Sequence, residues 1–188
     1  MNRQQQIFAF ASLVALVVLG RFIPHVANFA PVGAASLMAG YLFRSKWLAV
    51  SVPFLGMLVS DFLFAGFYTP EVMAFVYAGL MLPVLLGAWL RKPSTSQEAI
   101  SHPKMSRLVI LAGDSFGSSM IFFVLSNLGT WMFGGMYALN AAGLSACFLA
   151  AIPFYKATFF GDLAFSLALF GLLNLASAPV FKRVLSRA

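Results

Sequence analysis

Three carboxylates and two cations interrupt the apolar stretches of this chain, and they are the residues best able to do chemistry. They are Asp61, Glu71, Asp162, Arg21 and Lys156. An ionisable group at the centre of a bilayer costs at least about 2.5 kcal/mol, so each needs a partner or a purpose. They could pair with one another and tie helices together, or they could line a pocket for a polar solute. Both roles can coexist, because a pocket needs fixed walls.

Polar and aromatic residues at nearby positions extend this candidate pocket. They are Asn28, Tyr68, Asn127, Trp131, Tyr137, Asn140 and Tyr155. Asn127 and Trp131 are four residues apart, so they share a helix face if a helix continues that far. An amide beside an aromatic ring is suited to holding a planar ligand. Trp131 could equally be an interfacial residue at the end of a span.

Composition indicates that these residues are carried by membrane helices. Hydrophobic residues make up 61% of the 188 residues and charged residues only 9%, which is far from the composition of a soluble domain. Since each span needs roughly 20 apolar residues, the chain has room for about six spans and for no separate soluble catalytic domain. The net charge of +7 lies in short clusters between apolar runs. Membrane topology explains such clusters, and nucleic acid is not an expected partner.

The apolar pattern predicts an all-α integral membrane protein, with one domain over 1–188 and six transmembrane helices in one bundle. The expected spans cover about 7–23, 31–43, 47–67, 72–90, 108–128 and 158–178, with a polar loop over 91–107. The first is read as a span because no small-residue cleavage site follows it. The second reaches only about 20 Å, which is shorter than the hydrocarbon core of roughly 30 Å. It must be extended at its ends or shielded by its neighbours.

The segment 140–155 is apolar enough to cross, but it follows the glycines at 134 and 135 and contains Pro153, which favours a break in the helix. We expect a re-entrant or interfacial helix at the outer face before the last span, and a seventh crossing is the alternative.

With six spans, ten basic residues lie on one side: Arg3, Arg44, Lys46, Arg91, Lys92, Lys104, Arg107, Lys182, Arg183 and Arg187. Only Arg21 and Lys156 lie opposite, whereas a seventh crossing gives eight against four. The positive-inside rule therefore predicts cytoplasmic N- and C-termini.

Other chemical signatures are scarce. HExxH, CxxC and P-loop patterns are missing, and neither an enzyme nor a cofactor is expected. His25 and His102 fall on opposite sides of the predicted membrane and cannot share a metal. Asp114 lies on the cytoplasmic half of the fifth span, and pairing with Arg107, Arg44 or Lys46 is the default expectation. Coupling to a partner is the alternative role for Asp114, and Cys147 is expected to be a buried thiol.

Two stretches, Asn28–Phe43 and Ser60–Gly66, resemble the substrate-binding S components of energy-coupling factor vitamin transporters. Through Ser126–Trp131 and Ala151–Lys156 the chain is also similar to an uncharacterised bacterial family of membrane proteins with the same layout. The resemblance implies a six-helix bundle in the bacterial cytoplasmic (inner) membrane that binds a small polar or planar micronutrient near the outer face. Its binding loops would follow the first, third and fifth helices.

The resemblance also implies a partner. S components carry an AlaxxxAla pattern on the first helix that packs on a transmembrane coupling subunit with separate ATPases, and Ala11 and Ala15 match it. Some relatives work alone. The leading hypothesis is therefore a transport subunit for a vitamin-like solute. The main rival is a structural or assembly protein without a transported ligand. A membrane enzyme that uses Asp61, Glu71 or Asp162 as an acid or base is a distant third.

Overall fold

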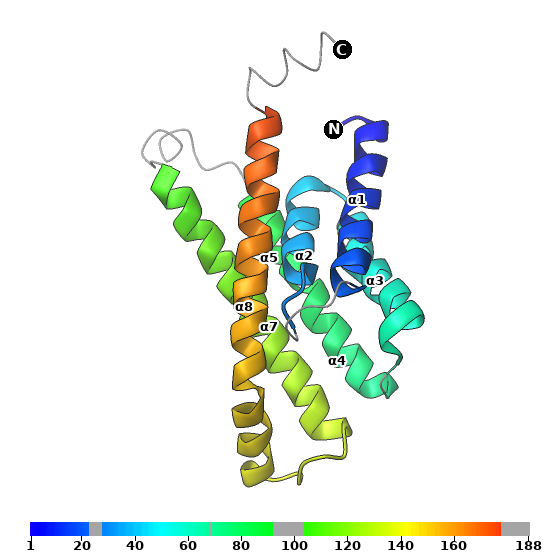
Figure 1. The fold of residues 1–188 in the computed structure, drawn as a ribbon, viewed down its shortest axis with the longest axis vertical. Coiled ribbons are helices and arrows are strands. Elements are labelled where there is room, and N and C mark those ends of the chain that lie inside the picture. Colours follow the sequence, from blue (N-terminus) through cyan, green and yellow to red (C-terminus); the bar gives the residue numbers. More distant parts are fainter. Residues whose placement is uncertain (23–27, 68, 92–103, 178–188) are drawn as a thin grey trace.

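The computed structural model describes residues 1–22, 28–67, 69–91 and 104–177. Within them the chain is all-helical, as predicted, and makes six helical passes. The passes are α1 (Arg3–Phe22), α2 (Val32–Leu42), α3 (Lys46–Ser60) with the π-helical turn η1 (Asp61–Ala65), α4 (Pro70–Met81) with α5 (Pro83–Leu90), α7 (Lys104–Phe133) and α8 (Ala141–Ser177). Successive passes run back and forth, so the start of α1 and the end of α8 lie at the same end of the bundle (Figure 1).

Five of these passes are long and apolar enough to cross a membrane: Arg3–Phe22, Lys46–Phe64, Pro70–Leu90, Val109–Phe133 and Ala141–Leu175. Their outer faces carry large apolar side chains; Phe8 is 76% exposed and Phe160 58%. Apolar residues in such numbers on the outside are typical of a surface that faces lipid rather than water. The chain is therefore a multi-pass membrane protein.

The short helix α2 lies at the centre of the bundle. It packs against α5, α3 and α8, and every residue from Val32 to Gly40 is buried. Its 11 residues span only about 16 Å. The surrounding helices shield it, as expected for a helix too short to cross the hydrocarbon core. Arg91 donates hydrogen bonds to the carbonyl oxygens of Gly40 (3.3 Å) and Phe43 (2.5 Å), and its positive charge suits the C-terminal end of the helix dipole.

Two glycines allow α2 and α5 to touch backbone to backbone. A Cβ atom added to Gly40 would lie 2.0 Å from the carbonyl oxygen of Val84, and one added to Gly87 would lie 1.9 Å from that of Leu37. No side chain larger than hydrogen fits at either position. The central helix is thus fixed in place by reciprocal contacts of the kind that small residues provide between membrane helices.

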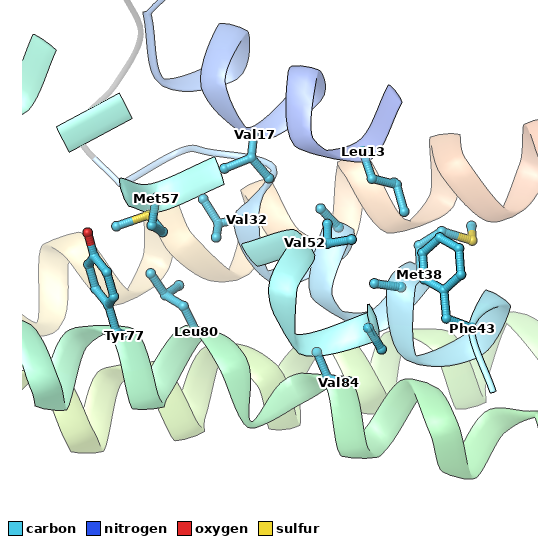
Figure 2. Close-up of a cluster of buried hydrophobic side chains, with 13 residues drawn as sticks. Leu13, Val17, Val32, Met38, Phe43, Val52, Met57, Tyr77, Leu80 and Val84 are labelled. Carbon is cyan, nitrogen blue, oxygen red and sulfur yellow. The ribbon is translucent and has the colours of Figure 1, made fainter. Parts of the chain in front are cut away.

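The apolar core surrounds α2 on the sides of α1, α3, α4 and α5 (Figure 2). Val17 of α1 and Val52 of α3 are fully buried in it, and Leu80 and Val84 close it from α4 and α5. Tyr77 is the one member with a hydroxyl, and Figure 2 shows that hydroxyl at the edge of the cluster. The core therefore has a polar margin on that side.

The segment 140–155 differs from the expectation of a separate re-entrant helix. It forms the first part of α8, which continues through Pro153 to Ser177 as one helix of 37 residues. Proline removes only one backbone donor, and membrane helices tolerate that loss. At about 55 Å, α8 is much longer than the hydrocarbon core, and Figure 1 shows the first turns of α8 and the last turns of α7 extending beyond the other helices.

Candidate functional site

A cavity of about 450 Å³ lies at the end of the bundle opposite the start of α1. Its walls come from the last turn of α1, the first turn of α2, the end of α3, much of α4, the part of α7 from Ser118 onward, and the part of α8 from Ala151 to Asp162. The candidate residues Asn28, Asn127, Tyr155 and Asp162 line it, together with Arg21. Residues far apart in the sequence therefore meet in one polar cavity because helical passes alternate in direction.

Asp162 lies on the inner wall of the cavity and is only 2% exposed. Its Oδ2 accepts a hydrogen bond from Ser119 Oγ on α7 at 2.8 Å. The backbone amides of Gly33 and Ala34, in the first turn of α2, also face the carboxylate. The approach is so close that a Cβ atom on Gly33 would lie 2.3 Å from Asp162 Oδ1. A carboxylate at a helix N-terminus is stabilised by the unpaired amides and the helix dipole.

Asp61 has a different environment and does not line the cavity. It is 1% exposed, its Oδ1 accepts from Arg21 Nη1 at 2.6 Å, and its Oδ2 accepts from the Tyr77 hydroxyl at 2.7 Å. Arg21 also donates to Ser60 Oγ. These bonds join α1, the end of α3 and α4, so Asp61 is part of a structural ion pair, which is one of the roles expected for it.

Two polar side chains, Tyr155 and Asn127, lie among aromatic residues in the cavity wall. Tyr155 packs against the rings of Phe116 and Phe123, with centroids 6.3 and 5.1 Å away. The Tyr155 hydroxyl is buried and has no hydrogen-bond partner among the described residues. Asn127 donates from Nδ2 to the Phe123 carbonyl at 2.7 Å, while the buried Cys147 thiol lies 3.9 Å from its Oδ1. Among the described residues, the Tyr155 hydroxyl is thus unpaired and the Asn127 oxygen accepts from a weak thiol donor, so both keep hydrogen-bonding capacity beside the cavity.

Other predicted site residues lie outside the cavity lining. Trp131 shares α7 with Asn127 as expected, but its Nε1 donates to the Ala138 carbonyl at 3.0 Å. Asn140 caps α8, because its Oδ1 accepts from Gly143 N at 2.9 Å. Tyr137 is half-buried in the same connection, and Lys156 is exposed. Among the described residues the ion pair joins Arg21 to Asp61, and Lys156 and Asp162 do not pair with each other.

Three further predictions concern residues away from the cavity. Tyr68 lies outside the described residues. Ala11 and Ala15 are exposed on α1, and no partner chain is present to contact them. Asp114 is 9% exposed, and its Oδ2 has no hydrogen-bond partner among the described residues.

Small hydroxyl residues complete the cavity, and the sequence did not single them out. Ser118, Ser126 and Thr130 line it from α7, and Thr158 lines it from α8. The spacing of these residues in the sequence could have shown that they share a helix face with the predicted site residues. Positions 118, 122, 126 and 130 repeat every four residues, and 155, 158 and 162 repeat every three or four, so each set shares a helix face. Across the described ranges, no three His, Cys, Asp or Glu side chains cluster as metal ligands.

Six helical passes, five of them long and apolar enough to cross a membrane, define a multi-pass α-helical membrane protein. The chain belongs to the family of unknown function DUF6580, whose model matches residues 1–184. Neither a curated protein nor a solved structure matches the chain.

Proposed function

We propose that the protein binds a small planar, polar solute of vitamin-like size in this cavity and acts as a transport subunit for its uptake. The observation that carries the proposal is a cavity of about 450 Å³ whose wall includes Tyr155, a residue with a buried hydroxyl that has no hydrogen-bond partner in the described part of the chain. Ligand pockets usually occupy about 300–1,000 Å³ and combine apolar walls with a few polar groups. A polar atom left unpaired inside a protein is costly unless something occupies the space beside it.

The lining favours a flat molecule with hydrogen-bonding edges. Phe122, Phe123, Phe154 and Tyr155 supply aromatic surface, which packs well against a ring. Asn28 and Asn127 supply amides on other walls, and amides both donate and accept. The charges of Arg21 and Asp61 neutralise each other, so the ligand need not carry an anionic group.

The predicted topology opens the cavity to the outside. Arg3, Arg44, Lys46 and Arg91 lie at the opposite end of the bundle from the cavity, and basic residues favour the cytoplasmic side. A solute would then enter from outside the cell. The resemblance to energy-coupling factor S components suggests that a coupling subunit with ATPases drives release inward. Ala11 and Ala15 are exposed on α1 and are the proposed contact for it; uptake by the protein alone is the other form of the same proposal.

Thermal melting of the purified protein in detergent, with a panel of B vitamins, nucleobases and their precursors, tests the proposal. A ligand at 100 times its dissociation constant adds about 2.7 kcal/mol of stability, so a clear rise in melting temperature is expected from one class of compound. Asn127→Ala and Tyr155→Phe should abolish the rise. Tyr137→Phe is the matched control, because Tyr137 lies outside the lining. If no compound stabilises the protein, or if all three variants respond alike, the proposed pocket is wrong.

A structural or assembly role is the second candidate, and the network of Arg21, Asp61 and Tyr77 favours it. This network ties three helices together, and of its members only Arg21 lines the cavity. In that case Asn127→Ala and Tyr155→Phe would lower stability and no ligand would be lost. The same melting experiment therefore separates the two functions.

A further inference from the structure

Three buried hydroxyls beside and below Asp162 have no partner. Ser115 and Ser166 are fully buried, Ser118 is 1% exposed, and the oxygen of each makes no hydrogen bond with any described residue. Serines inside membrane helices normally bond back to a carbonyl of the preceding turn, as Ser119 and Ser145 do here. Three serines that do not are therefore unusual, and they leave several oxygen lone pairs unused.

The register of α7 and α8 brings these oxygens to one region. The hydrogen bond from Ser119 to Asp162 sets the two helices at one level, and the helices run in opposite directions. One turn away from the cavity mouth, α7 presents Ser115 and α8 presents Ser166, so these two serines share the next level. Ser118 lies beside Asp162 and lines the cavity with it. The hydroxyl oxygens of these serines therefore extend from the cavity wall at Ser118 into the interior of the bundle at Ser115 and Ser166.

The charge of this region is unbalanced. Among the described residues, the polar groups beside Asp162 are hydroxyls and the backbone amides of the first turn of α2, and its neighbour Lys156 is exposed. A carboxylate removed from water needs a compensating charge, which either a proton or a metal cation can provide. A proton would occupy one carboxylate oxygen and leave all three serines unpaired. A cation would use the lone pairs of the serines as well, so the surplus of oxygens favours it.

We propose that Asp162, Ser115, Ser118 and Ser166 bind a monovalent cation of the size of Na⁺ between α7 and α8, at the inner end of the cavity. Carboxylate and hydroxyl oxygens are the ligands that hard cations prefer. One carboxylate matches a single positive charge. Both carboxylate oxygens face the first turn of α2 and Ser119 bonds Oδ2, so the ion would use the remaining lone pairs of the carboxylate. The site does not depend on the proposed solute, so it is tested without any solute present.

Melting temperature in NaCl and in choline chloride, at one ionic strength and pH, is the first measurement. Choline is too large for the site, and Na⁺ at 100 times its dissociation constant should raise the melting temperature by about 5 °C or more. Ser115→Ala combined with Ser166→Ala should lower the affinity for Na⁺ at least about tenfold, and Asp162→Asn should abolish the rise. Ser145→Ala, a serine of α8 outside the site, should leave the rise unchanged.

Binding of radioactive ²²Na⁺ to the purified wild-type protein gives a second readout that needs no variant to fold. Saturable binding near one ion per chain supports the site. Equal melting temperatures in the two salts, together with no saturable binding, overturn it. A rise that survives in the double serine variant but not in Asp162→Asn would mean that the ion sits at the cavity mouth, which contradicts the proposed ligands. A rise produced by lower pH alone, through Asp162, would identify a proton in place of the cation.

Discussion

Asp61 and Asp162 are both almost fully buried carboxylates near the same end of the bundle, yet their surroundings differ. Asp61 accepts from a guanidinium and a phenol, so both oxygens and the charge are satisfied by side chains. Asp162 has a hydroxyl and backbone amides beside it and a cavity in front of it. Burial alone therefore does not distinguish a structural carboxylate from one that is available to bind. The two kinds of carboxylate are distinguished by whether a cationic side chain pairs with them.

The same substitution at both positions should separate them most clearly. Asp61→Asn leaves Arg21 without its counter-charge, and breaking a buried pair costs about 3 kcal/mol or more. Asp162→Asn loses only the favourable contact of the charge with the α2 dipole, about 1 kcal/mol. Unfolding of each variant by SDS in mixed micelles measures both values. Equal losses would contradict the distinction.

Gly33→Ala sharpens the comparison because it acts on Asp162 alone. The added methyl group overlaps the carboxylate and must push it from the first turn of α2, at a cost of about 2 kcal/mol. Gly171→Ala is the matched control, since no atom lies within 4 Å of a Cβ at that position. The stability of the control should change by less than about 0.5 kcal/mol. Similar values for the two variants would mean that Asp162 is not packed on α2.

Two tyrosines offer a conservative version of the same test. Tyr77→Phe removes the hydrogen bond to Asp61 Oδ2 and should lower the free energy of unfolding by about 1–2 kcal/mol. Tyr155→Phe removes a hydroxyl that has no described partner, so the stability without ligand should change by less than about 0.5 kcal/mol. The unfolding midpoint measures both. A loss at Tyr155 as large as at Tyr77 would indicate that its hydroxyl is already paired in the empty protein.

The smallest effect is expected at Lys156. This residue is exposed, and an exposed charge without a partner contributes little to stability. Lys156→Ala should therefore change the free energy of unfolding by less than about 0.5 kcal/mol in the same micelles. A loss above about 1 kcal/mol would restore Lys156 as the counter-charge of Asp162.

Much of the fold follows from sequence patterns that depend on local chemistry. Apolar length predicts the spans, and the cost of burying charge predicts that Arg21 needs a carboxylate. The choice of Asp61 over Asp162 depends on which helix ends meet, and no pattern in one chain fixes that. Ser118 and Thr158 were missed because hydroxyl residues on membrane helices usually serve close packing. Pro153 predicts a break, but α8 continues through it as one helix, because proline removes only one backbone donor and membrane helices tolerate that loss.

The burial of α2 has a consequence for how the protein enters the membrane during synthesis. Insertion depends on the apolar length and composition of each segment as it leaves the ribosome, and 11 helical residues are too few to span the core alone. The contacts that shield α2 come mainly from α3, α5 and α8, which are made later. The second pass should therefore complete its crossing only after the downstream helices have been inserted. The backbone contact between α2 and α5 at Gly40 and Gly87 would then hold α2 inside the bundle.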